Sequence, residues 1–465
     1  MSLKPYAEYK DSGVEWLGEV PYEWEVSRLK NSVQEAKNGV WGSDPDGSEL
    51  DLRCVRVADF DRSRQSIHDR NSTLRRVSLD DRKGRILEKG DLLLEKSGGG
   101  EKSPVGFVVL YDREEPAVCS NFVARIVIRP GMDSRFWTYV HSMFYSLRLT
   151  QRSIKQATGI QNLDQTSYFN ELVALPPYTV QCDIADYLDQ ETAEIDAFIA
   201  DQEELIALLA ERRTATITQA VTKGLDPDAP VKDSGNQWIA ALPAHWAVTA
   251  MKHLTELQTG VTLGKTYSED AEEYPYLRVA NVQVGYVDLS TLKTVQVTKE
   301  VAKRSMLRPG DVLMTEGGDR DKLGRGCIWD AQVQPCLHQN HVFAVRCSEQ
   351  LSNAFLVYVL DSQVARNYFN VTAKQTTNLA ATNSTLVKNF RFGLPPLTEQ
   401  HDILAYLDRE TAEIDAAIAD AREAIALSKE RRAAVISAAV TGKIDVRGLV
   451  APATSNVEAE SVGIA

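Results

Sequence analysis

The sequence contains one long helix-forming stretch twice, and this duplication limits what the chain can fold into. Residues 189–222 match residues 408–441 at 23 of 34 positions when they are aligned with an offset of 219. Alanine, leucine and glutamate, which favour helices, predominate in both copies, and glycine and proline are absent from them. Apolar residues recur at steps of three and four, as on one face of a helix. These positions are Ile184, Leu188, Ile195, Phe198, Leu205, Leu209, Ile217 and Ala220 in the first copy, and Ile403, Leu407, Ile414, Ile418, Ile425, Val435 and Ala439 in the second. A lone helix of about 42 residues, roughly 60 Å long, cannot bury such a face, so the two copies are predicted to pack on each other.

The rest of the chain is repeated as well. The segment Lys10–Trp16 recurs as Lys232–Trp238, and Leu175–Pro177 recurs as Leu394–Pro396. The stretches between the shared motifs, notably residues 61–89 and 283–309, have diverged. A common frame around different inserts is expected of two related modules that each recognise a different target.

The repeat predicts an α+β fold with two mixed α/β modules. Each module is followed by a long helix, and the two helices are expected to form an antiparallel coiled coil with pseudo-two-fold symmetry. The tail is expected to be disordered because it contains few aromatic residues. The predicted boundaries are 1–180 for the first module, 181–224 for its helix, 225–399 for the second module, 400–443 for its helix and 444–465 for the tail.

Short β-branched and aromatic stretches predict the strands of each module, and longer apolar stretches predict a helix. Thr179 and Thr398 are predicted to cap the N-termini of the long helices, and Gly224 and Gly442 to end them. In the first module, strands are expected at 55–58, 92–94, 106–111 and 122–128 and a helix at 136–149. In the second, strands are expected at 276–279, 312–315, 326–329 and 342–346 and a helix at 353–370.

The net charge of −13 at first argues against a nucleic-acid partner, but its distribution does not. Residues 181–222 carry 10 acidic and 2 basic side chains, whereas residues 1–180 carry 26 and 25. The modules are therefore free to carry local basic surfaces. The lack of a long apolar run, the polar N-terminus and six cysteines without close pairs predict a cytoplasmic, reduced protein.

Basic residues are concentrated in one segment of each module. Residues 53–89 contain 11 lysines and arginines against 6 acidic residues. Arginine predominates, and its planar guanidinium suits phosphate oxygens and guanine edges. An alternative is an ordinary solvated loop of mixed charge. The candidate DNA-binding residues here are Arg53, Arg56, Arg62, Arg64, Arg75 and Arg76 in the first module and Arg278, Asn281, Lys303 and Arg304 in the second.

Glycine-rich and amide-rich loops occupy equivalent places in the two modules. A glycine backbone beside a basic side chain can approach a phosphate closely, and glutamine and asparagine can pair with adenine. Tight turns and ordinary loop polarity are the alternatives. The candidates are Lys96, Gly98, Gly99, Lys102, Gln161 and Asn162, and in the second module Gly317, Gly318, Arg320, Lys322, Lys374, Gln375 and Asn378.

No catalytic, metal or cofactor site is predicted. The segment Leu175–Tyr178 resembles the Pro-Pro-aromatic loop of adenine methyltransferases but begins with leucine where they need asparagine or aspartate. Asp91, Glu95 and Lys96 lack the Glu-x-Lys spacing of a nuclease site. A zinc site fits no standard spacing and has no counterpart in the first module. Its candidate ligands would be Cys327, Cys336, His338 and His341.

The repeated motifs resemble those of a known family, the DNA specificity subunits of type I restriction–modification systems. The resemblance rests on the Pro-x-x-Trp segments at Pro21 and Pro243, on the junction Leu394–Gln400 and on the duplicated long helices. The first copy departs from the junction pattern because it lacks the glutamate before Gln181. The resemblance covers roughly residues 10–445.

The resemblance implies two target-recognition domains that read the halves of a split, asymmetric DNA site. It implies that the helices act as the spacer, and that the partners are double-stranded DNA, modification subunits, expected to be two, and a restriction subunit. Adenine N6-methylation and cleavage would belong to those partners, so the chain would not be an enzyme. The rival interpretation is a protein-binding scaffold with a coiled-coil spacer and no DNA role. A methyltransferase in its own right is disfavoured because no glycine-rich methyl-donor loop follows a strand.

Overall fold

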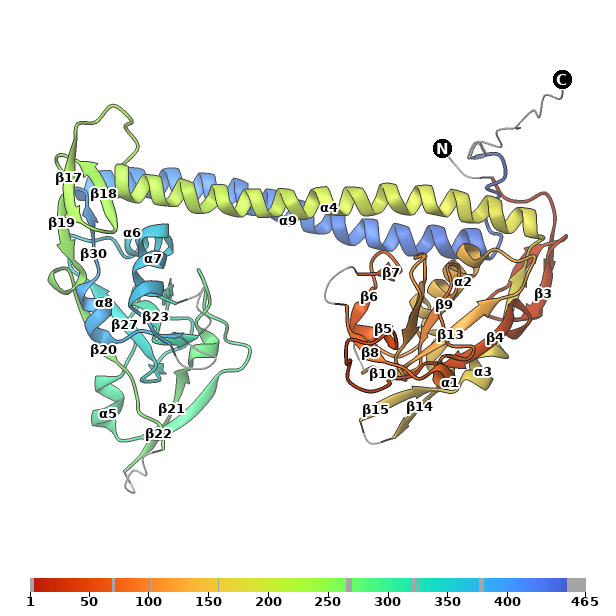
Figure 1. Cartoon of the computed structure of the whole chain (residues 1–465). Helices are drawn as coiled ribbons and strands as arrows, with labels where there is room; N and C mark the ends of the chain where they lie inside the picture. Colours follow the sequence, from red (N-terminus) through yellow and green to blue (C-terminus); the bar gives the residue numbers. More distant parts are fainter. Residues whose placement is uncertain are drawn as a thin grey trace. The chain divides into compact units, whose positions relative to one another are not determined.

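The chain forms two compact units in the computed structural model. Unit 1 combines residues 1–203 with 423–465, and unit 2 comprises residues 204–422. The structure describes residues 4–68, 72–100, 103–157, 159–264, 270–318, 323–324, 326–375 and 380–449. Helices α4 (Tyr178–Lys223) and α9 (Leu397–Val440) each contribute to both units (Figure 1).

The module of unit 1 is built mainly from short strands. Its central antiparallel sheet has the order β11-β9-β13-β4, and a second sheet, β12-β5-β8, contains one parallel pair. A small third sheet has the order β10-β15-β14. The elements are β1 (Tyr9–Asp11), β2 (Glu19–Pro21), β3 (Glu25–Arg28), β4 (Val33–Asn38), β5 (Asp51–Val55), β6 (Phe60–Asp61), β7 (Ser66–Ile67), β8 (Leu74–Arg76), α1 (Leu79–Arg82), β9 (Leu92–Glu95), β10 (Ser97–Gly98), β11 (Val108–Leu110), β12 (Ala117–Cys119), β13 (Val123–Ile128), α2 (Ser134–Ser146), β14 (Ile154–Ala157), β15 (Ile160–Leu163), α3 (Gln165–Phe169) and β16 (Leu172–Leu175).

The module of unit 2 repeats this topology. Its sheets β20-β27-β23-β25, β22-β21-β26 and β24-β29-β28 correspond to the three sheets of unit 1. The predicted α+β class with two repeated modules is therefore confirmed. The elements are β17 (Val231–Asn236), β18 (Ile239–Pro243), β19 (Ala247–Ala250), β20 (Thr255–Thr259), β21 (Glu272–Leu277), β22 (Lys293–Val297), α5 (Lys299–Arg304), β23 (Val312–Thr315), β24 (Gly317–Gly318), β25 (Gly326–Ile328), β26 (Leu337–His338), β27 (Val342–Cys347), α6 (Asn353–Asp361), α7 (Gln363–Thr372), β28 (Lys374–Gln375), β29 (Ala380–Ala381), α8 (Ser384–Asn389) and β30 (Arg391–Leu394).

The long helices pack antiparallel inside each unit. In unit 1, Ile184 and Leu188 near the start of α4 share a buried core with Ile436 near the end of α9. In unit 2, Ile217 near the end of α4 shares a core with Leu407 near the start of α9. The ends of the apolar faces are thus buried by the partner helix together with the module, whereas Phe198 and Leu205, predicted in the same face of α4, are 44% and 40% exposed.

Each unit also has an ion pair between the two long helices, with the aspartate and the arginine on opposite helices in the two units. In unit 1, the Arg432 guanidinium lies 3.1 Å from the Asp196 carboxylate. In unit 2, the Arg213 guanidinium lies 2.9 Å from the Asp415 carboxylate. Each pair joins α4 to α9, and each aspartate and arginine is the repeat of the other pair's residue at an offset of 219.

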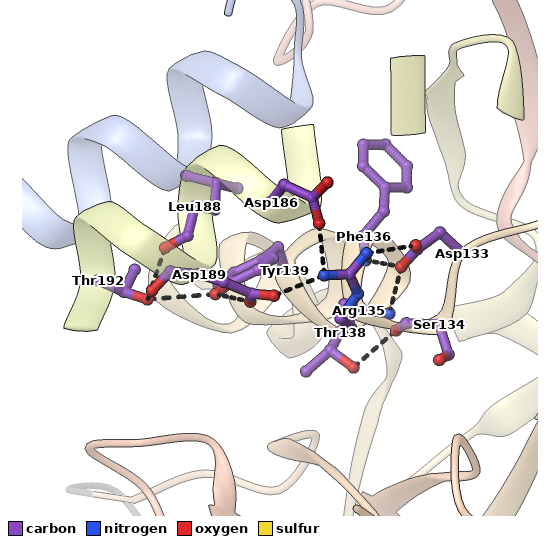
Figure 2. A network of polar contacts seen from close by, with 10 residues as sticks. All are labelled: Asp133, Ser134, Arg135, Phe136, Thr138, Tyr139, Asp186, Leu188, Asp189 and Thr192. Atoms are coloured by element: carbon purple, nitrogen blue, oxygen red, sulfur yellow. Dashed lines mark hydrogen bonds and ion pairs between the residues drawn. The ribbon is translucent and has the colours of Figure 1, made fainter. Parts of the chain in front are cut away.

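A hydrogen-bonded anchor joins the first module to α4 (Figure 2). The Tyr139 hydroxyl on α2 donates to the Asp189 carboxylate at 2.8 Å and lies 3.2 Å from the Thr192 hydroxyl. Burial, followed by the charge of Asp189, raises the pKa of Tyr139, so its hydroxyl stays protonated. Arg135 adds ion pairs to Asp186 and Asp189 at 2.7 and 2.9 Å.

A buried glutamine completes this anchor. The side-chain amide of Gln181 accepts a hydrogen bond from the backbone N–H of Asp133 at the start of α2 and donates one to the Pro176 carbonyl. A buried amide costs free energy unless it is hydrogen-bonded, so this group favours one placement of α2 on the helix.

The second module repeats the anchor on α9. Tyr358 donates to Asp408 at 2.7 Å and lies 3.2 Å from the Thr411 hydroxyl. Gln400 accepts from the backbone N–H of Ser352 and donates to the Pro395 carbonyl. The two anchors agree within 0.1 Å in both tyrosine distances. Each module therefore sits on its helix in the same way.

Several predicted elements differ from the structure. The strand predicted at 55–58 ends at Val55, because the Asp59 carboxylate accepts from the Arg56 backbone and closes a 3₁₀ turn over Val57–Asp59. The helix predicted at 353–370 is broken at Ser362, which caps α7. The long helices begin at Tyr178 and Leu397, so Thr179 and Thr398 lie inside the first turn and are not caps.

The segment after α9 is more ordered than predicted. Gly442 follows α9 with a φ of 73°, and the Lys443 N–H bonds to the Ala438 carbonyl, as in a Schellman cap. Val446, predicted to lie in a disordered tail, is buried in the core of unit 1. Residues 450–465 of that tail lie outside the described residues.

The anchor predicts a measurable loss on removing one hydroxyl. Tyr139→Phe should lower the free energy of unfolding by about 1–2 kcal/mol, because a hydrogen bond to a carboxylate is lost at a buried site. Tyr358→Phe should cost a similar amount. Chemical unfolding of the single variants would measure this. Tyr22→Phe is the matched control, because residue Tyr22 is 62% exposed. This variant should change stability by no more than about 0.5 kcal/mol. Equal stability of Tyr139→Phe and Tyr22→Phe would contradict the anchor.

Candidate nucleic-acid interface

Loops at one end of the central sheet of unit 1 bring some of the predicted site residues together. Strand β9 ends where the antiparallel strand β13 begins, since Glu95 pairs with Val123. The turn before β13 and the segment after β5 lie beside them and, with Gly98 and Gly99, line a common hollow. We call these strand ends, together with the adjoining strands β10 and β15, the strand-end face.

The glycine-rich and amide-rich segments are paired in the strand-end face. Ser97 pairs with Asn162 and Gly98 with Gln161 across strands β10 and β15. The Asn162 side chain accepts from the Ser97 hydroxyl at 2.7 Å and is exposed. Gln161 is buried, and its side-chain oxygen accepts a hydrogen bond from the Val105 backbone N–H. Little of the Gln161 side chain is therefore available to a base.

Most of the predicted arginines of the first module are held by carboxylates of the same module. Only 11% of the Arg53 side chain and 13% of the Arg75 side chain is exposed, so these two brace the module and offer little surface for a DNA contact. The Arg64 guanidinium is exposed, and its charge acts on the Asp196 carboxylate of α4. The paired arginines are Arg53–Glu115, Arg56–Asp59, Arg62–Glu95, Arg75–Asp44 and Arg76–Asp46.

Glu95 is the buried member of one of these pairs. Its carboxylate lies 2.6 Å from the Arg62 guanidinium, and burial raises its pKa. Asp91 is also buried, and it pairs with Arg125 at 2.6 Å. The equivalent pair in unit 2 joins Asp311 to Arg346. These acids are occupied by internal partners, which fits a structural role for the residues that resembled a nuclease site.

In unit 2, part of the predicted site is structural. Asn281 is fully buried, accepts from the Arg278 backbone and donates to the Asp288 carbonyl, so it cannot reach DNA. Arg278 donates to the carbonyl of Thr291. Lys303 and Arg304 at the end of α5 are exposed.

The second glycine-rich segment again forms a strand. Gly317 pairs with Ala381 and Gly318 with Ala380, while Lys374 pairs with Ala381 from the other side. Of Gln375 only the backbone is described. Four further predicted residues lie outside the described residues: Lys102, Arg320, Lys322 and Asn378.

The strand-end face also contains residues that the sequence prediction missed. A hollow of about 510 Å³ is lined by Trp41, Arg56, Gly98, Asn121 and Phe122, among others. Trp41 and Phe122 are 39% and 45% exposed. The internal repeat could have pointed to this turn. Asn121 and Phe122 precede β13, and Asn340 and His341 precede β27 at the equivalent positions, 219 residues later.

Among the described residues, no group of three or more histidine, cysteine, aspartate or glutamate side chains could hold a metal ion. His338, considered as a zinc ligand, is buried, and its Nδ1 lies 2.6 Å from the Val342 carbonyl oxygen. Burial lowers the pKa of His338 to about 4. Within the described parts of the chain, no helix is long and apolar enough to cross a membrane.

Comparisons with known proteins agree on one family. The family model described as "Type I restriction modification DNA specificity domain" matches residues 243–421. The EcoKI specificity subunit of Escherichia coli K12 is 23% identical over 337 residues, 71% of this chain and 67% of that protein. The EcoBI specificity subunit of Escherichia coli is 24% identical over 343 residues, 71% of this chain and 70% of that protein.

Solved structures show the same fold. A chain from a study of complex assembly in the type I restriction–modification system has a TM-score of 0.63 and 18% identity, covering 91% of this chain and 99% of its own length. The HsdS subunit from Thermoanaerobacter tengcongensis has a TM-score of 0.53 and 16% identity, covering 91% and 98%. The curated relatives, which are named specificity subunits, agree with the predicted class. Residues 243–421 thus match the model of a type I restriction–modification DNA specificity domain, and the chain is similar over 71% of its length to specificity subunits of these systems.

Proposed function

We propose that the two modules are target-recognition domains that read the two halves of one split, asymmetric DNA site. The observation that carries this proposal is the repetition of one fold and one anchor on both long helices. The side chains of the strand-end face of unit 1 differ from those at the corresponding strand ends of unit 2. Two identically mounted modules with different surfaces are suited to two different half-sites. A scaffold without a DNA role gives no reason for this combination.

The charges of the first module suggest that the chain binds DNA together with partners. Non-specific affinity for DNA grows with the number of cations free to meet phosphates. Five of the six arginines predicted in that module are paired with internal carboxylates. We therefore infer that modification subunits supply much of the phosphate contact, the methyl-donor site and the adenine N6-methylation chemistry. A restriction subunit would add cleavage, and the complex would work in the cytoplasm.

The long helices would set the gap between the half-sites. Helix α4 has 46 residues and α9 has 44. At 1.5 Å per residue each is roughly 65–70 Å long, about two turns of B-DNA at 34 Å per turn.

The proposal is tested by mapping N6-methyladenine in host DNA with and without the chain. The modification subunit is present in both strains. A split, asymmetric methylated motif that disappears with the chain would support the proposal. An unchanged set of methylated sites would overturn it.

Lengthening the spacer should change the gap. Four helix-forming residues inserted between Glu203 and Glu204 add about 6 Å, so the tolerated gap should grow by about one or two base pairs. The methylated motif reports the gap. The same four residues inserted after Asp228, in the connection between α4 and β17, are the control and should leave it unchanged. An unaltered gap in the helix variant would argue against a spacer role.

Exchanging one module should change one half-site. Replacing residues 10–175 with the corresponding module of another specificity subunit should alter one half of the methylated motif and preserve the other, because the second module stays intact. Replacing residues 232–394 should alter the opposite half. Simultaneous change of both halves in either chimaera would contradict modular reading.

A further inference from the structure

The hollow in the strand-end face of unit 1 has two exposed aromatic rings on its rim. Trp41 is held in place by Arg75, whose guanidinium carbon lies 4.6 Å from the centre of the indole ring. Arg75 also donates to the Trp41 carbonyl and pairs with Asp44. The ring is therefore oriented before any ligand arrives, although 39% of the residue remains exposed. Phe122, on the turn before β13, is 45% exposed.

The turn that carries Phe122 is fixed by its backbone. The Val123 N–H donates to the Ser120 carbonyl, and the Lys96 N–H donates to the Phe122 carbonyl. Asn121 between them is exposed, and its side-chain amide has no partner among the described residues. A free amide next to an apolar ring on a rigid turn is a recognition element, since both groups are positioned at little further entropic cost.

Unit 2 contains the same turn with a different ring. The Val342 N–H donates to the Gln339 carbonyl, and the Glu316 N–H donates to the His341 carbonyl, as in unit 1. Asn340 takes the place of Asn121, and His341 takes the place of Phe122. The His341 ring is held by the Glu316 carboxylate, 2.7 Å from Nδ1. The asparagine is retained while the neighbouring side chain changes from an apolar ring to a polar one.

We propose that Asn121 and Phe122 read an A·T base pair in the half-site of the first module. An asparagine amide can donate to N7 and accept from the N6 amino group of adenine, and phenylalanine can contact the C5-methyl group of thymine. The absence of a side chain at Gly98, where an added Cβ would meet no atom within 4 Å, leaves room for the DNA backbone beside the hollow. Asn340 and His341 occupy the same position in the second module, where the histidine presents a ring nitrogen in place of an apolar surface. This inference rests on the proposed function.

The test uses the full chain produced with its modification subunit. Methylated motifs are mapped for the wild type, Asn121→Ala and Phe122→Ala, with Asn340→Ala and His341→Ala as matched variants in the other module. Both unit 1 variants should lose discrimination at one A·T position of one half-site by about fivefold or more, and the other half-site should stay unchanged. The unit 2 variants should affect only the opposite half-site. All four side chains lie at turns outside the buried cores, so folding should be preserved, which thermal unfolding would verify.

A second measurement isolates the thymine methyl group. In duplexes carrying the mapped site, thymine at the affected position is replaced by deoxyuridine, which lacks the methyl. The replacement should weaken binding of the wild-type complex several-fold and leave binding of Phe122→Ala unchanged. A replacement of thymine in the other half-site serves as the control for the duplex.

The outcomes separate this inference from the proposed function. A wild-type chain without any methylated motif would overturn the proposed function. A wild-type motif that both unit 1 variants reproduce unchanged would overturn only the inference. Loss of complex assembly in these variants, with no methylated motif left, would also overturn it, because the hollow would then bind a protein partner.

Discussion

The structure depends on the burial of matching apolar positions near the ends of two long helices, which neither helix could bury alone. Ile184, Leu188, Ile403 and Leu407 are fully buried, and such side chains contribute about 1.5–3 kcal/mol each on burial. Burial alone is non-directional, so it does not fix how a module is oriented on its helix. The buried glutamines and the tyrosine–aspartate bonds add direction, because an amide or a hydroxyl shifted by an ångström would lose its partner. The apolar faces hold the parts together, and the polar groups select one arrangement.

Charge in this chain is used first to build the modules. The arginine-rich segment after β5 resembled a phosphate-binding surface, yet most of its guanidinium groups brace loops against nearby carboxylates. Arg56 with Asp59 closes a turn, and Arg62 neutralises the buried Glu95. Loops with few apolar contacts need such directional links to hold a single shape. Rigid loops are thus obtained at the expense of non-specific affinity for DNA, which agrees with the proposal that partner subunits supply phosphate contacts.

The elements governed by periodicity could be predicted from the sequence, and those governed by single side chains could not. The long helices follow from apolar residues at helical spacing, and β23 (Val312–Thr315) was predicted with its correct bounds. Ser362 interrupts a helix-like pattern because its hydroxyl caps the next helix, a local competition that averaged propensity does not register. Trp41 and Phe122 lie about 80 positions apart and meet only through sheet pairing, so no local pattern joins them. The shared offset of Asn121 and Asn340 was the available signal.

The repeat also explains how the chain can change what it reads without changing how it folds. The turns before β13 and β27 keep the same backbone hydrogen bonds, while their exposed side chains differ at one position, Phe122 against His341. Substitutions at exposed turn positions cost little stability because they leave the core and the backbone bonds intact. Recognition therefore lies at positions where the sequence can vary freely. The two halves share the anchors and the helix faces most closely, because substitutions there would cost stability. Two copies of one fold, each with its own recognition turn, can therefore bind a DNA site whose two halves differ in sequence.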